Sequence, residues 1–158
     1  MCSDKDFLAL FHFIQSKKFG KLQTINVTVN AQNQDEMRAD LESIVRLVSG
    51  EIKRYSLVGS AKPFFHASLD LFFDNQILVR YVYTQAPSQT FKDWRLYLTG
   101  AELYFRGGSD VIECKKAVPE AKTDTYAVAD FIKETDVLPL SQNNIQSLNA
   151  ILAKTIIK

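Results

Sequence analysis

The residues KDWRLYLTGAELYFRGGSDVIECK, 92–115, decide the fold class. Apolar and polar side chains alternate along this stretch, and the alternation is interrupted only at Thr99-Gly100 and at 107–110. A period of two is typical of a half-buried strand, and the two interruptions are rich in residues that favour turns. The stretch therefore predicts three antiparallel strands joined by two tight connections.

A two-residue turn at Thr99-Gly100 sorts the side chains of the first two strands into two distinct faces. One face is apolar and pairs Trp94 with Phe105. The other face is polar and aromatic, and its charges are matched across the strands, which stabilises an antiparallel pair. This second face carries Asp93, Arg95, Tyr97, Glu102, Tyr104 and Arg106.

The same test of register applies to the residues that precede this stretch. A three-residue loop at 74–76 places Leu69 opposite Tyr81 and Asp70 opposite Arg80. Apolar side chains then share one face of the hairpin, and opposite charges meet on the other. Strands are expected near 52–58, 65–73 and 77–84. A further strand is expected at 22–30, where β-branched residues alternate with polar ones.

Helices are predicted at both ends of the chain and between the first two strands. Residues 5–19 have apolar side chains at helical spacing after Asp4 or Ser3, either of which can cap the helix, and a final helix follows a capping Ser141. A third helix has its apolar stripe at Met37, Leu41, Ile44, Val45 and Val48, with Glu36 and Asp40 expected on the solvent side. Residues 125–135 predict a short helix.

Together these elements predict one α+β domain over residues 1–158. Its sheet is expected to be an antiparallel meander of about six to seven strands, with the N-terminal and C-terminal helices packed on one face. A chain of 158 residues with 46% hydrophobic residues can bury a substantial core.

Charge and hydropathy exclude several classes of partner. The net charge is only +1, and basic residues are interspersed with acidic ones, which argues against a nucleic-acid binder. No run of about 20 apolar residues is present, so a membrane span is not expected. Two cysteines do not make a disulfide framework. A cytoplasmic location is therefore expected.

The motifs of common enzymes are absent from the sequence. There are two histidines, His12 and His66, with no zinc-ligand spacing around them. No G-x-S-x-G elbow, phosphate-binding loop or G-x-G-x-x-G fingerprint occurs. The sequence therefore predicts no catalytic residues, no metal, no cofactor and no enzymatic activity.

The leading functional hypothesis is a non-catalytic protein-binding module of the inhibitor, immunity or adaptor type. It would act through the exposed polar-aromatic face, because tyrosine and arginine are the residues that anchor protein interfaces. The expected partner is a protein, and a homodimer is possible through the wide apolar surface of the first helix.

Two alternatives stand beside this hypothesis. A curved sheet closed by the C-terminal helix can leave a cavity, which would make the chain a small-molecule or lipid-binding protein. A small hydrolase-like enzyme is the third hypothesis. The walls of the cavity would be Phe72, Tyr81, Tyr83, Trp94 and Phe105.

Overall fold

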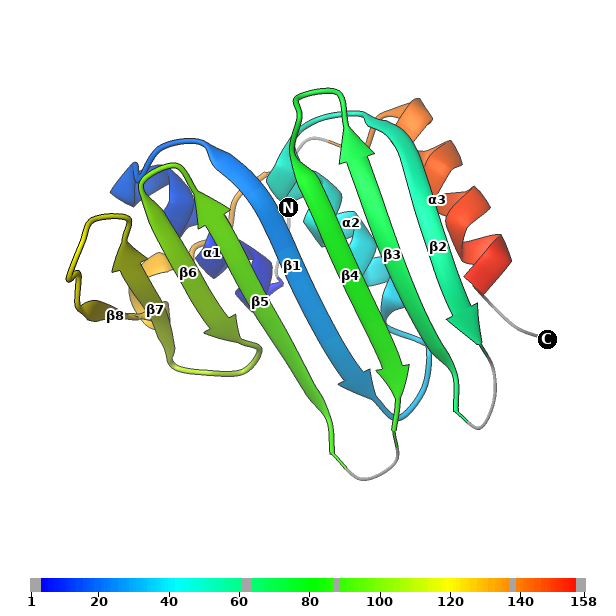
Figure 1. Ribbon diagram of the computed structural model, residues 1–158, viewed down its shortest axis with the longest axis horizontal. Helices are drawn as coiled ribbons and strands as arrows, with labels where there is room; N and C mark the ends of the chain where they lie inside the picture. The colour runs from blue at the N-terminus through cyan, green and yellow to red at the C-terminus, as the bar shows by residue number, and fades with distance from the viewer. Residues whose placement is uncertain (1–3, 61–63, 87–88, 137–138, 156–158) are drawn as a thin grey trace.

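The chain folds into one mixed eight-stranded sheet with helices on one of its faces (Figure 1). The structure is a computed structural model that describes residues 4–60, 64–86, 89–136 and 139–155. The helices in the described part are α1 (Lys5–Lys17), α2 (Met37–Val48), α3 (Gln142–Thr155) and the 3₁₀ turn η1 (Val128–Phe131). The strands are β1 (Leu22–Ala31), β2 (Ile52–Ser60), β3 (His66–Phe73), β4 (Leu78–Gln85), β5 (Phe91–Leu98), β6 (Ala101–Arg106), β7 (Val111–Lys116) and β8 (Thr123–Ala127).

The predicted α+β class is confirmed, but the predicted simple meander is wrong. The strand order is β2-β3-β4-β1-β5-β6-β7-β8, so β1 lies between β4 and β5 and separates two runs of hairpins (Figure 1). β1 pairs in parallel with β4 and antiparallel with β5. Its inward side chains Ile25, Val27 and Val29 are at most 1% exposed, as expected for a strand in the middle of a sheet.

Both registers derived from turn length are confirmed. Leu69 lies opposite Tyr81 and Asp70 opposite Arg80 across β3 and β4. Trp94 lies opposite Phe105 across β5 and β6. The hairpins form where they were expected because a slip of one residue would turn every apolar side chain toward solvent.

The ends of the helices follow their capping residues. The Asp4 carboxylate accepts a hydrogen bond from the Phe7 N–H at 3.0 Å, and Ser141 Oγ accepts one from the Asn144 N–H at 3.1 Å. Each bond satisfies an N–H that has no partner within its own helix. The capping residues predicted for α1 and α3 are thereby confirmed.

The helix predicted at 125–135 is wrong. Thr123–Ala127 instead form the edge strand β8, paired with β7, and only the four residues of η1 turn helically. Tyr126 lies opposite Ile112 and packs edge-on against Phe13 of α1, with the ring centroids 5.0 Å apart. Pairing with β7 and packing against α1 outweigh the helical spacing of a short apolar run.

The core lies between the sheet and the layer of α1, α2 and α3, which all cover the same face (Figure 1). Cys114 belongs to it with 2% of its surface exposed. Among the described residues, no helix is both long and apolar enough to span a bilayer.

Candidate functional site

Asp40 is a buried carboxylate on the inner face of α2. It lies one turn after Met37 and one turn before Ile44, which both face the sheet, and only 5% of its surface is exposed. The prediction that Asp40 lies on the solvent side is therefore wrong. A buried carboxylate requires partners, because removing a charge from water is costly.

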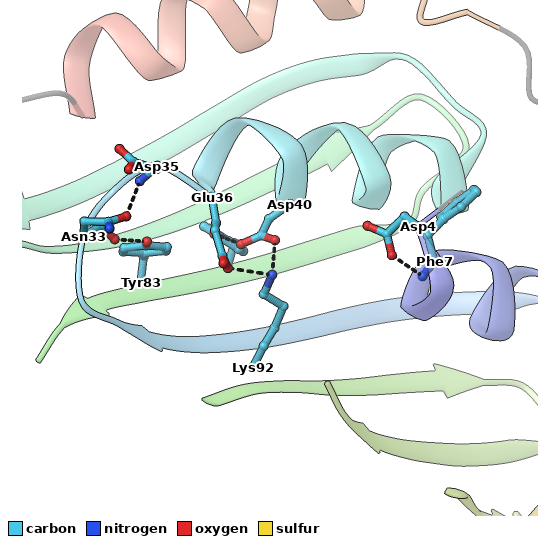
Figure 2. A network of polar contacts seen from close by, with 9 residues as sticks. Asp4, Phe7, Asn33, Asp35, Glu36, Asp40, Tyr83 and Lys92 are labelled. Atoms are coloured by element: carbon cyan, nitrogen blue, oxygen red, sulfur yellow. Dashed lines mark hydrogen bonds and ion pairs between the residues drawn. The ribbon is translucent and has the colours of Figure 1, made fainter. Parts of the chain in front are cut away.

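Lys92 is the cationic partner of Asp40. It rises from β5 toward the first turns of α2, where its Nζ donates to Asp40 Oδ1 and, at 3.2 Å, to Glu36 Oε2 (Figure 2). The Lys92 side chain is 22% exposed, whereas that of Glu36 is 62% exposed. The ion pair with Asp40 is thus the inner end of the cluster, and Glu36 is its outer end.

Tyr81 completes the set of bonds around Asp40. Its hydroxyl donates to Asp40 Oδ2 at 2.6 Å, so both carboxylate oxygens of Asp40 have a donor. Burial and the neighbouring Asp40 carboxylate raise the pKa of Tyr81 far above its ordinary value, and the hydroxyl keeps its proton. The neighbouring Tyr83 donates to the Asn33 carbonyl, and burial raises its pKa to about 12.

Burial and mutual attraction together shift the pKa values of Asp40 and Lys92. Burial raises the pKa of Asp40, and its attraction to Lys92 and the hydrogen bonds from Lys92 and Tyr81 offset part of that rise. Burial alone would lower the pKa of Lys92, but attraction and hydrogen bonds from Asp40 and Glu36 raise it above the ordinary lysine value. Lys92 therefore stays charged, and its ammonium has one more proton to donate than its two carboxylate partners use.

A pocket of about 420 Å³ opens beside this ion-pair cluster. Lys92 and Glu36 form one side of it, and Asp6 of α1 and Gly107 of the β6–β7 connection form another. The connection is held against β5 by a hydrogen bond of 2.7 Å from the Gly107 N–H to the Lys92 carbonyl. This volume lies within the range of small-ligand pockets.

The lining of the pocket favours a ligand with hydroxyl groups. Asp6 and Glu36 offer carboxylate oxygens, and Lys92 offers a proton. In the described part of the chain, Asn30 Oδ1 is buried and accepts no hydrogen bond, while its Nδ2 donates to the Gln89 carbonyl at 2.6 Å. Perturbed pKa values beside a pocket are a physical signature of a functional site. We refer to Asp6, Asn30, Glu36, Lys92 and Gly107 as the Lys92 pocket.

The residues predicted for a binding face lie elsewhere, on the side of the sheet that carries no helix. Arg106 makes two hydrogen bonds to Asp93, at 2.7 and 2.9 Å, which lower the pKa of Asp93. Arg95 lies 3.6 Å from Glu102 and stacks over the Tyr104 ring. The structure brings these residues together through the predicted register, with Tyr97 opposite Glu102. That this face binds a partner stays a prediction.

The residues predicted to line a cavity lie in two different places. Tyr81, Tyr83, Trp94 and Phe105 are at most 2% exposed and belong to the packed core. Phe72 lies on β3 on the opposite side of the sheet, under the Arg54 guanidinium. The lining of the Lys92 pocket includes none of these five residues.

The fold is shared with proteins of known structure. The chain is similar to UDP-N-acetylglucosamine 3-dehydrogenase GnnA from Acidithiobacillus ferrooxidans, with a TM-score of 0.65 and 12% sequence identity over 98% of this chain. It is also similar to levoglucosan dehydrogenase in complex with NADH and levoglucosan, with a TM-score of 0.64 and 11% identity over 97% of this chain. No family model and no curated protein sequence matches the chain.

The chain spans about half the length of these structures. It covers 53% of the GnnA chain and 54% of the levoglucosan dehydrogenase chain. A super-repressor mutant of Gal80p from Saccharomyces cerevisiae is also similar, with a TM-score of 0.63 and 8% sequence identity. The match covers 96% of this chain and 49% of the Gal80p chain. At these identities the likeness establishes the fold.

The predictions of a non-catalytic protein-binding module and of a chain that is not an enzyme are wrong. They rested on the absence of sequence motifs, whereas the fold is one that dehydrogenases contain. The alternative of a cavity walled by the five predicted residues is not supported by their positions, and none of the structures named above is described as a hydrolase.

A nicotinamide dinucleotide does not fit the N-terminus of α2 and the pocket beside it. A pyrophosphate is usually bound at the N-terminus of a helix, after a glycine-rich turn. The residues before α2 are Asn33, Gln34, Asp35 and Glu36, which offer two carboxylates and no glycine. Asp6 adds a third carboxylate to the adjoining pocket. This acidic environment would repel a pyrophosphate.

Proposed function

We propose that the chain is the substrate-side part of a sugar oxidoreductase, and that its Lys92 pocket binds an uncharged polyhydroxylated ligand. The observation that carries the proposal is the position of a half-buried, paired lysine beside a polar pocket in a fold that dehydrogenases contain.

The printed names of the similar proteins support a carbohydrate ligand. One is a UDP-N-acetylglucosamine dehydrogenase, and another was solved with levoglucosan and with L-sorbose. Hydroxyl groups can donate to Asp6 and Glu36 and accept from Lys92. Because these two carboxylates and Asp40 outnumber the single ammonium, an uncharged sugar is favoured over a sugar phosphate.

Gal80p shows that the fold alone does not decide the function, since the form of known structure is a super-repressor mutant. The ion-pair cluster of Lys92, Asp40 and Glu36 supports the substrate role in this chain. A cluster of this kind is costly to bury, and its position beside a pocket favours a role in ligand binding over a purely structural one.

The test is titration of the chain with levoglucosan and with L-sorbose, followed by amide chemical shifts in NMR. We expect shifts that cluster at 30–36 and around Lys92. Lys92→Met should weaken binding roughly tenfold or more, because a hydrogen bond to a charged group contributes about 1.5–3 kcal/mol. Lys115→Met removes the same charge from an exposed position outside the pocket and serves as the control.

Two results would contradict the proposal. One is the absence of shifts with both sugars at millimolar concentration. The other is equal weakening of binding by Lys92→Met and Lys115→Met, which would attribute the effect to net charge. The melting temperature of each variant shows whether the fold is retained, because Lys92→Met leaves Asp40 without its cation.

A further inference from the structure

Two carboxyl groups, Asp6 and Glu36, line the Lys92 pocket, and a third, Asp40, forms an ion pair with the same lysine; their environments differ. Asp40 lies inside, with both oxygens engaged by Lys92 and Tyr81. Glu36 lies at the outer end, where its 62% exposed side chain is well solvated. Asp6 borders the pocket from α1, and among the described residues no side chain donates a hydrogen bond to it or forms an ion pair with it.

The Asp6 carboxylate lies close to the space that a side chain at Gly107 would occupy. A Cβ atom built on Gly107 would lie 3.1 Å from Asp6 Oδ2 and 3.4 Å from the Lys92 Cβ. The carboxylate therefore occupies the space beside the glycine that a larger residue would fill. The backbone N–H of Gly108 donates a hydrogen bond to it.

The charges around Asp6 come from three elements. Burial raises its pKa, and the neighbouring Asp4 of α1 adds to the rise. The Gly108 hydrogen bond and the attraction of Lys92 on β5 act in the opposite direction, without cancelling the effect of burial. At the start of α2, Glu36 and Asp40 both form ion pairs with the Lys92 ammonium and so compete with Asp6 for its attraction.

We propose that Asp6 is the carboxyl group of this pocket that exchanges a proton when a hydroxyl-bearing ligand enters. The ligand hydroxyl donates its hydrogen bond to the Asp6 carboxylate, and the carboxyl group releases its proton to solvent. Asp40 does not line the pocket, and both of its oxygens already have donors. Glu36 is mostly exposed and is already paired with Lys92. This inference rests on the proposed binding of a sugar in the Lys92 pocket.

The sign of the pH dependence follows from this arrangement. A donor that binds only the ionised form of Asp6 lowers the pKa of Asp6 in the complex. Ligand affinity therefore rises with pH across the titration of Asp6, by at most about tenfold per pH unit for one released proton. Above that range the affinity levels off.

The test combines ¹³C NMR titration of the aspartate carboxyl groups with levoglucosan binding measured across pH. We expect the Asp6 pKa to lie above the ordinary aspartate range in the free chain and to fall when levoglucosan is saturating. Asp6→Asn should remove the pH dependence of the affinity. Gly107→Ala, which displaces the Asp6 carboxylate without removing it, should reduce this pH dependence. Asp110→Asn changes an exposed aspartate on the same connection and should keep the wild-type profile.

The outcomes separate this inference from the proposed function. A wild-type chain that binds levoglucosan with no change in the Asp6 pKa would overturn the role of Asp6 and leave the pocket as a sugar site. A wild-type chain that binds no sugar at any pH would overturn the proposed function, and the role of Asp6 with it. If Asp6→Asn does not fold, the carboxyl titration of the wild-type chain decides the question.

Discussion

At the scale of residues, the hydroxyl of Tyr81 determines how the Asp40 carboxylate is held. It lies in the core and donates to the oxygen of Asp40 that Lys92 does not contact. Without this donor, one oxygen of a buried carboxylate would lose its partner while the rest of the ring stayed packed. The hydroxyl thus stabilises the charged form of Asp40 and, through it, the position of Lys92.

We therefore expect Tyr81→Phe to lower the free energy of unfolding by about 1–3 kcal/mol, the usual consequence of leaving a buried polar group unsatisfied. Urea-induced unfolding followed by Trp94 fluorescence measures the change. Tyr126→Phe makes the same chemical change at a ring whose hydroxyl has no hydrogen bond in the described structure, and should have little effect. Equal losses in the two variants would contradict the role of the Tyr81 hydroxyl.

Asp40 also shows what the sequence could and could not predict at this scale. Its spacing of three from Met37 and four from Ile44 places it on the apolar stripe of α2, which is a readable signal of burial. The identity of its partner has no such signal. Lys92 lies 52 positions away on β5, and only the fold brings the two together.

At the scale of elements, α3 is attached to the rest of the molecule by a buried asparagine. Asn144 is 4% exposed. Its Oδ1 accepts from the Ile52 N–H at 2.9 Å, and its Nδ2 donates to the Gly50 carbonyl at 2.9 Å. These bonds satisfy backbone groups at the point where the chain leaves α2 and enters β2. The helix is therefore fixed to the edge of the sheet by polar contacts as well as by Leu148 and Ile151.

We expect Asn144→Ala to lower the free energy of unfolding by about 1–3 kcal/mol, because it leaves a buried N–H and a buried carbonyl without partners. The amides of Ile52 and of α3 should lose protection in hydrogen exchange. Gln146→Ala, at an exposed position of the same helix, is the control and should change the stability by less than about 0.5 kcal/mol. Unchanged exchange at Ile52 in Asn144→Ala would refute the proposed attachment.

The elements that the sequence predicted best are those in which two constraints agree. At Thr99-Gly100 the turn length and the sorting of apolar side chains give the same register, and the structure has it. At 125–135 the apolar spacing was the only constraint, and it fits a helix as well as a strand followed by a turn. Pairing with β7 decided between them, and a strand pairing of this kind has no local signal.

At the scale of the whole molecule, one face of the sheet bears helices and the other bears paired charges. The Lys92 pocket lies on the helical side, near the N-terminal end of α2. The dinucleotide-binding fingerprint is absent from the sequence, and the approach to α2 is acidic. We therefore expect that the proposed binding of a sugar in the Lys92 pocket does not require a dinucleotide.

We accordingly expect the chain to bind levoglucosan without NADH, and to show no saturable binding of NADH alone. Quenching of Trp94 emission and enhancement of NADH emission measure the second point. An added chain that binds NADH, such as full-length levoglucosan dehydrogenase, is the positive control for the assay. Saturable NADH binding in the micromolar range would show that the acidic approach to α2 does not exclude a pyrophosphate.

The position of β1 determined how much of the topology could be predicted. In the described sheet seven strands follow one another as hairpins, from β2 to β4 and from β5 to β8, and their patterns predicted this arrangement for all of them except β8, where a helix was expected. The insertion of β1 between the two runs is a pairing across more than 50 residues of sequence, such as Ile25 with Val79. Side-chain alternation within a strand carries no information about such a neighbour.

This insertion also has a consequence for the order of folding. Each run of hairpins can form from contacts that are close in sequence, whereas β1 must find both β4 and β5 to join them. Contacts of large sequence separation form late and slowly, because the intervening chain must be ordered first. We therefore expect β2–β4 and β5–β8 to form separately and to be joined last by β1, although β1 is the first of these strands to be synthesised. The amides of β1 should exchange with solvent only when the whole molecule opens.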